Sequence, residues 1–207
     1  MRTIYRILTP IFSLAVFPVL FFLPLFHIKI SSTLSSSLVN MVGLKEYSSM
    51  YDMIKTFSGT EKNTLIKVLI DAFKDGDSKI GEMLTSKNYL YVFAVFFILA
   101  LVFALLVFIF SLFTKKLLLA GAFNLAAIVS LIGMNMSFNA FAKPFLSGQI
   151  SISSLLGSDL GVLSNLLGNV AKMQDLSLAL AYHAGLFALV LALILCACAF
   201  MEKMYNR

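Results

Sequence analysis

The sequence predicts an all-α integral membrane protein with four transmembrane helices. Of its 207 residues, 60 % are hydrophobic and only 13 % are charged, whereas soluble domains contain about 25 % charged residues. Four apolar runs contain no Asp, Glu, Lys or Arg, and each has the roughly 20 residues that a helix needs to cross a bilayer core of about 30 Å. The composition argues against a soluble enzyme, a disordered chain and a nucleic-acid-binding module.

The four spans are expected at residues 7–28, 89–113, 117–138 and 178–201. Only Thr114, Lys115 and Lys116 separate the second span from the third, so these two spans should form a tight hairpin. The first run is longer than the apolar part of a signal peptide, and no small-residue cleavage site follows closely, which favours a retained span. We expect residues 1–207 to form a single membrane domain, with 29–88 and 139–177 as its two extracytoplasmic loops.

The distribution of basic residues predicts that both termini are cytoplasmic. Six basic residues and one acid flank the spans on the side of the termini: Arg2, Arg6, Lys115, Lys116, Lys203 and Arg207 against Glu202. The two longer loops are nearly balanced in charge. Short cytoplasmic flanks carry an excess of Lys and Arg, so we expect both termini to be cytoplasmic. We also expect a multi-pass protein of the plasma membrane. Loops that lack tryptophan and disulfides favour a bacterial host.

The third and fourth spans carry the features that favour helix packing or partner binding. Small residues recur on one face of the fourth span, notably Ala181, Gly185, Ala188 and Ala192, and small residues allow helices to approach closely in lipid. In the third span Asn124 and Asn135 lie about three turns apart on one side. This helix thus has two faces suited to protein contacts, and it should be central in the bundle or reserve one face for another subunit.

The first two spans differ from these. Pro18 falls in the middle of the first span, where a proline removes a backbone hydrogen bond, so it predicts a kink and is a candidate hinge. The second span is rich in phenylalanine around most of its circumference and is typical of a lipid-facing helix.

Both outer loops have apolar residues at helical spacing. Residues 44–57 and 65–73 predict two helices in the first loop, and residues 155–173 predict one in the second. These amphipathic helices should form a cap that rests on the outer leaflet.

No catalytic, metal or cofactor site is expected. Residues 71–82 resemble a calcium-binding EF-hand loop, but Phe73 and Lys79 occupy ligand positions, so a helix end followed by a turn is the preferred interpretation. His27 and His183, together with Asp175, are a candidate metal or pH-sensing group, although histidines at headgroup depth are more often amphipathic anchors. Cys196 and Cys198 are interpreted as small buried residues.

Four spans, cytoplasmic termini and a larger first outer loop resemble the claudin-type tetraspan layout. The resemblance is one of topology, because that family's first outer loop carries a tryptophan and a cysteine pair that this sequence lacks. Strands are expected in the family's outer loop, whereas helices are predicted here. The resemblance implies no function for this chain.

These observations favour a non-enzymatic accessory or scaffold subunit. Its expected partners are the lipid bilayer and a membrane protein or further copies of the chain, and not nucleic acid. The alternative is a small channel or permease component for an uncharged or lipidic solute, suggested by Asn124, Asn135 and Pro18. Spans without charged residues argue against a proton- or sodium-coupled transporter.

Overall fold

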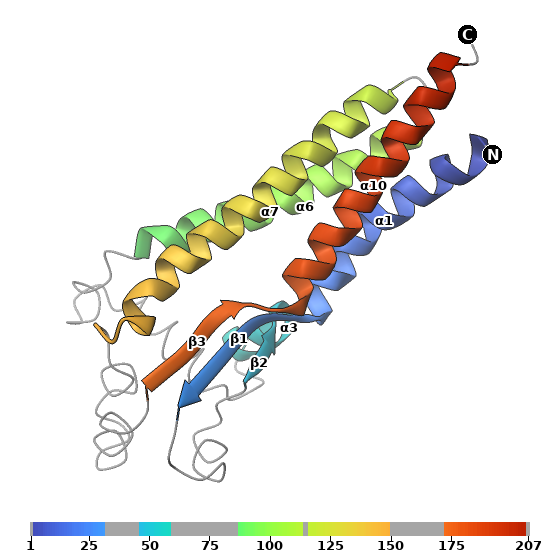
Figure 1. Ribbon diagram of the computed structural model, residues 1–207. Helices are drawn as coiled ribbons and strands as arrows, with labels where there is room; N and C mark the ends of the chain where they lie inside the picture. The colour runs from blue at the N-terminus through green and yellow to red at the C-terminus, as the bar shows by residue number, and fades with distance from the viewer. Residues whose placement is uncertain (1, 32–45, 59–86, 114–115, 150–171, 206–207) are drawn as a thin grey trace. The chain divides into compact units, whose positions relative to one another are not determined.

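The computed structural model describes the chain in five stretches (Figure 1), namely residues 2–31, 46–58, 87–113, 116–149 and 172–205. The chain forms two compact units. The helical unit comprises Met1–Leu23, Val92–Met136 and Leu180–Arg207, and the sheet unit comprises Pro24–Tyr91 and Ser137–Ala179.

The long helices fall on the four apolar runs of the sequence. They are α1 (Arg2–Phe22), α6 (Lys87–Ser111), α7 (Leu117–Leu146) and α10 (Leu180–Tyr205). Three of them, α6, α7 and α10, are long and apolar enough to cross a membrane, and α1 contains a shorter apolar stretch at Ile7–Phe22. The prediction of a mostly helical, membrane-embedded protein is confirmed.

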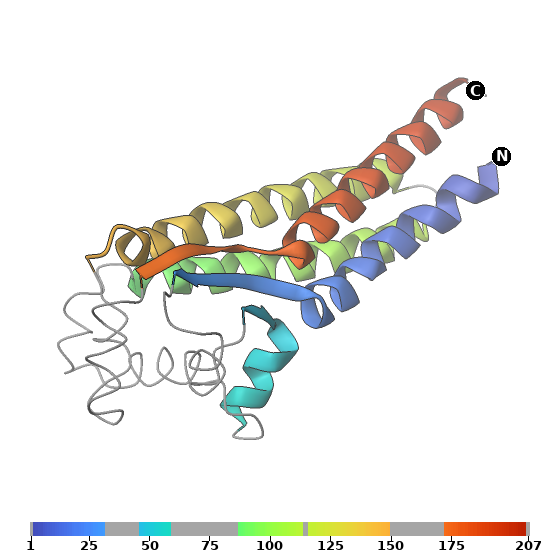
Figure 2. The same ribbon diagram turned by 60° about the horizontal axis from the view of Figure 1, so that its bottom comes forward.

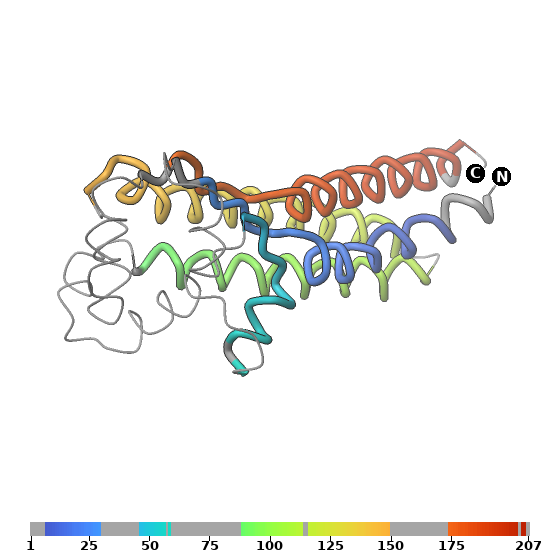
Figure 3. Tube along the Cα trace, turned by 90° about the horizontal axis from the view of Figure 1, so that it is seen from below, coloured from blue at the N-terminus to red at the C-terminus, as the bar shows by residue number. Residues whose placement is uncertain are grey.

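Within the helical unit the four helices contact one another in a closed ring. The Ser13 hydroxyl of α1 donates a hydrogen bond to the Ala104 carbonyl of α6. The α7 backbone at Gly133 lies under the Phe96 ring of α6, and the Cys196 thiol of α10 donates to the Leu117 carbonyl of α7 at 3.2 Å. The ring closes because α10 runs along α1 (Figures 1 and 3).

The outward faces of this bundle are almost entirely large and apolar, which suits contact with lipid. On α7, for example, the exposed side chains include Leu118, Leu125, Val129 and Ile132. In water such a surface would be costly at about 25 cal/mol per Å² of apolar area. In a bilayer it incurs no such cost, because lipid tails are as apolar as these side chains.

The first span is shorter than predicted, because its helix ends at Phe22 and not at Ile28. Pro24 cannot continue the helical hydrogen bonding, and a residue before proline is biased towards extended backbone. The chain then continues as strand β1 (Pro24–Ser31). His27 therefore lies on a strand, and its interpretation as a histidine at the end of a transmembrane helix is wrong.

The expectation that the outer segments are purely helical is also wrong, since strands occur in both. Strand β1 is the centre of an antiparallel sheet with the order β2-β1-β3, in which β2 is Tyr47–Ser49 and β3 is Lys172–Leu178 (Figure 2). Phe26 is opposite Leu178 and Ile28 is opposite Leu176. Because side chains alternate along a strand, these four apolar residues share one face of the sheet.

The apolar face of the sheet has its partner on the second half of α7. Phe26 packs against Phe138 with ring centroids 5.3 Å apart. Phe138, Phe141 and Phe145 recur at helical spacing, contact one another in series and are all buried. This packing explains why α7 continues past the predicted end at residue 138 and includes Pro144 in its last turns.

A short helix, α3 (Met50–Phe57), follows β2 directly. It covers the second half of the helix predicted at 44–57, while the first half contains strand β2. Ser49 caps its N-terminus: the Ser49 hydroxyl accepts from the Asp52 amide, and the Asp52 carboxylate accepts from the Ser49 amide at 2.9 Å. The helix predicted at 65–73, the EF-hand-like window at 71–82 and most of the helix predicted at 155–173 lie outside the described residues.

The cap gives a first testable prediction. Replacing Ser49 by alanine should destabilise α3 by about 1 kcal/mol, because an N-terminal amide of the helix loses its acceptor. Hydrogen exchange of the α3 amides should then become roughly five-fold faster, while exchange in α10 stays unchanged. Unchanged exchange in α3 would contradict the role of the cap.

Candidate functional site

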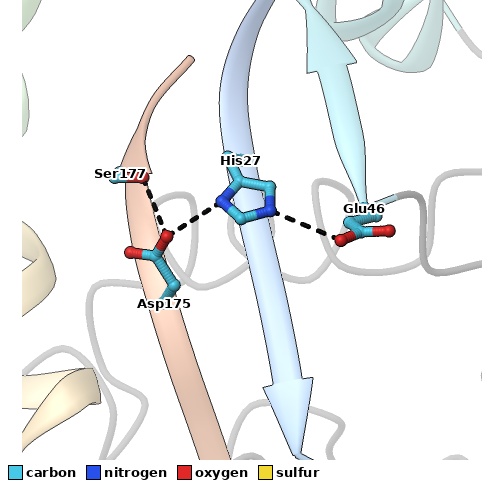
Figure 4. A network of polar contacts seen from close by, with 4 residues as sticks. All are labelled: His27, Glu46, Asp175 and Ser177. Carbon is cyan, nitrogen blue, oxygen red and sulfur yellow. Dashed lines mark hydrogen bonds and ion pairs between the residues drawn. The ribbon is translucent and has the colours of Figure 1, made fainter.

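A network of polar side chains lies on the face of the sheet opposite the apolar residues. Its centre is His27 of β1, whose Nδ1 atom lies 2.9 Å from Oδ2 of Asp175 on β3 (Figure 4). Its Nε2 atom lies 3.4 Å from Oε1 of Glu46, the residue before β2. Ser177 donates its hydroxyl hydrogen to the same Asp175 oxygen at 3.2 Å.

The backbone register of the sheet explains why these residues meet. His27 is opposite Ser177 on β3 and opposite Tyr47 on β2. The Ile28 amide donates to the Glu46 carbonyl at 2.8 Å, which fixes Glu46 beside the central strand. Side chains of residues opposite and diagonal in an antiparallel pair lie within reach of each other, which brings Asp175 to His27 on one side. Glu46 reaches the ring from the other side, from its position just before β2.

The His27 ring is held on a third side by Tyr47. The two rings are stacked with centroids 4.7 Å apart. The His27 side chain is 18 % exposed, whereas those of Asp175 and Glu46 are 43 % and 59 % exposed. The imidazole is thus more enclosed than either acid, and water reaches the network from the side of the acids.

Sequence reasoning found part of this network. It grouped His27 with Asp175, and the structure brings these two together. It also included His183, which lies in the helical unit, is exposed, and has its ring edge-on to Tyr182. Glu46 and Tyr47 were missed. In the part of the chain that the structure describes, no group of three or more histidine, cysteine or acidic residues is arranged to hold a metal ion.

A second set of polar groups lies inside the helical bundle, where Asn124 and Asn135 of α7 have different environments. Asn124 is fully buried, and neither its amide nitrogen nor its amide oxygen has a hydrogen-bond partner among the described residues. Asn135 is only half-buried, and its side chain is hydrogen-bonded to Tyr182 of α10. One asparagine therefore links two helices, whereas the other leaves two polar atoms unsatisfied.

The small residues predicted on one face of α10 lie inside the bundle. Ala181, Gly185, Ala188 and Ala192 are all buried. Gly185 packs against Leu20 of α1, where an added Cβ atom would lie 3.3 Å from a Leu20 methyl carbon. These small residues of α10 are therefore buried by packing within the helical unit of a single chain.

The remaining predicted positions are the candidate hinge proline of the first span and the two cysteines of the fourth. Pro18 lies inside the continuous helix α1 with an exposed side chain. Cys196 and Cys198 are both free; Cys196 is buried and Cys198 is half-buried.

In comparisons with known proteins, no protein family, curated protein or solved structure matches the chain. Function is therefore inferred from the geometry of the described residues and from the sequence.

Proposed function

We propose that this chain is a non-enzymatic accessory or scaffold subunit of the bacterial plasma membrane. In this proposal α1, α6, α7 and α10 all span the membrane, both termini are cytoplasmic, and the sheet unit is extracytoplasmic. The proposed role is to dock a membrane-protein partner. The basic residues flanking the spans support the orientation.

The observation that carries the docking role is an exposed apolar face on α3. Tyr51 and Ile54 are one turn apart on the same side of this helix and are 44 % and 50 % exposed. They lie outside the apolar spans, so the bilayer core does not explain their exposure, and we propose a protein partner on this face in place of the outer leaflet. Tyrosine is enriched in protein interfaces, and the cap at Ser49 fixes the first turn of the helix.

The test is gentle extraction from native membranes, followed by native mass spectrometry of the wild type and of Ile54→Asp. A matched control is Gln174→Asp, which adds the same charge at an exposed position of β3. We expect the wild type and the control to retain a stoichiometric partner. Ile54→Asp should weaken its binding at least ten-fold, as expected for a central interface residue.

Two outcomes would contradict the proposal. The first is a wild-type protein that is monomeric and free of partners in native membranes while its cellular function is intact. The second is a partner that binds Ile54→Asp as tightly as the wild type.

The alternative, a small channel or permease component for an uncharged or lipidic solute, is favoured by one observation. Asn124 places two unsatisfied polar atoms in the interior of the bundle, where a passing solute could bind them. Flux of glycerol or another small uncharged solute through proteoliposomes, abolished by Asn124→Val, would support this alternative. Proteoliposomes without flux for any such solute would contradict it.

A further inference from the structure

The position of His27 between two acids from different segments has a consequence for pH response. Asp175 belongs to the second outer segment, 148 residues along the chain from His27, and Glu46 belongs to the first. The imidazole lies on the central strand and contacts a carboxylate of each neighbour (Figure 4). It is thus the single side chain in this network that links both outer segments.

The protonation state of the ring decides how many of these links are hydrogen bonds. An ionised carboxylate is only an acceptor, and a neutral imidazole has one N–H donor. A neutral His27 can therefore donate either to Asp175 or to Glu46, and its other nitrogen then faces an acceptor. The imidazolium donates from both nitrogens at once, and both bonds are then charge-assisted.

The two contacts differ in strength. The contact to Asp175 is the shorter, at 2.9 Å, and Ser177 holds the same carboxylate oxygen in place. The contact to Glu46 is 3.4 Å long, and that carboxylate is the most exposed group of the network. A neutral ring should therefore keep its bond to Asp175 and lose the bond to Glu46.

Other charged or titratable groups near His27 do not reverse this argument. Lys29, further along β1, is opposite Asp175 in the register and adds positive charge beside that acid. From β2, Tyr47 contributes its ring, which stacks on the imidazole. The acids Asp175 and Glu46 are the groups that respond to the charge on the ring.

We propose that His27 is a pH-dependent link between the strands of the sheet. When the ring is protonated, the imidazolium joins Asp175 and Glu46 and ties β2 to the central strand. When the ring loses its proton, the link to Glu46 is released and β2 opens more often. The stabilisation is thus present at the lower pH and lost at the higher one. This proposal does not depend on the docking role.

The test uses hydrogen exchange in the full-length protein reconstituted in lipid nanodiscs, at pH 5.5 and pH 8.0. These values bracket the range in which histidine side chains change charge. The reporter is the Ile28 amide, which donates to the Glu46 carbonyl; its rate is divided by the intrinsic exchange rate at each pH. We expect its opening to be about two- to five-fold greater at pH 8.0, as for the loss of an exposed ion pair.

Variants test whether this pH dependence comes from the link between His27 and Glu46. His183→Gln removes the only other histidine of the chain and should leave the two- to five-fold change intact. His27→Gln and Glu46→Gln should each reduce the change to about one-fold. Protection of the α3 and α10 amides checks that each variant is folded, and Glu46→Gln remains informative if His27→Gln does not fold. A wild type with equal opening at both pH values would overturn the proposal, as would a full pH effect in folded His27→Gln or Glu46→Gln.

Discussion

Replacing Asn124 by valine is expected to raise the free energy of unfolding by about 1–3 kcal/mol. That is the desolvation penalty of a buried polar group without a hydrogen-bond partner, and both polar atoms of the Asn124 side chain are in this position among the described residues. Valine has no polar atom to satisfy, and it is larger than asparagine by about one methylene group. The gain should therefore exceed any small cost of repacking in the interior of the bundle.

The matched control is the same substitution at Asn135, on the same helix. Its side chain is hydrogen-bonded to Tyr182, and hydrogen bonds between transmembrane helices contribute about 0.6 kcal/mol on average and up to about 1.7. Asn135→Val should therefore lower the free energy of unfolding by an amount in this range. The two variants should shift stability in opposite directions.

Reversible unfolding in mixed micelles measures both effects. A loss of stability in Asn124→Val as large as that in Asn135→Val would contradict the description of Asn124 as unsatisfied. It would indicate that the Asn124 amide is bound, for example by water or by a solute, and would strengthen the channel alternative.

Replacing Gly133 by alanine is expected to destabilise the contact between α6 and α7 by about 1–3 kcal/mol, the usual cost of overpacking. A Cβ atom at this position would lie 2.8 Å from Cζ of Phe96 and 2.9 Å from its Cε atoms. These distances are far shorter than van der Waals contacts, so the tip of the half-buried Phe96 ring would have to shift.

Gly121 provides the control on the same helix. A Cβ atom there would lie 3.7 Å from the Cys196 sulfur, which is an ordinary contact. Gly121→Ala should thus be neutral or stabilising by up to about 1 kcal/mol, because alanine favours the helix. The substitution Phe96→Leu should restore most of the stability lost in Gly133→Ala, and equal effects of the two glycine substitutions would contradict the α6–α7 packing described here.

The sequence was sufficient to predict the long helices, because runs of 22 or more apolar residues leave few alternatives. It failed where a strand continues directly from an apolar run. Pro24 and the alternation of Phe26 and Ile28 with His27 and Lys29 were local signals of a strand, and they were included in the span because of their hydrophobicity. Alternation in β3, where Leu176 and Leu178 enclose Ser177, was overlooked because these residues lie where the predicted helix at 155–173 gives way to the predicted span at 178–201.

The polar network could be predicted only in part, since its members come from three separate segments. A strand pattern predicts which residues share a face, but not which strands pair. The link between His27 and Glu46 requires β2 beside β1, and the link to Asp175 requires β3 on the other side. Nor does residue type predict the difference between Asn124 and Asn135, which depends on what lies opposite each on the neighbouring helices.

The most direct test of the proposed four-span arrangement is cysteine labelling in intact cells with a membrane-impermeant maleimide. Cys196 and Cys198 are first replaced by serine, which can still donate to the Leu117 carbonyl from position 196. Single cysteines are then introduced at Thr3, Gln174 and Met204; Gln174 is exposed on β3 and lies outside the proposed docking face. We expect labelling of Gln174→Cys in intact cells, and labelling of Thr3→Cys and Met204→Cys only after permeabilisation. Labelling of Thr3→Cys together with Gln174→Cys in intact cells would contradict this arrangement, because α1 would then not cross the membrane.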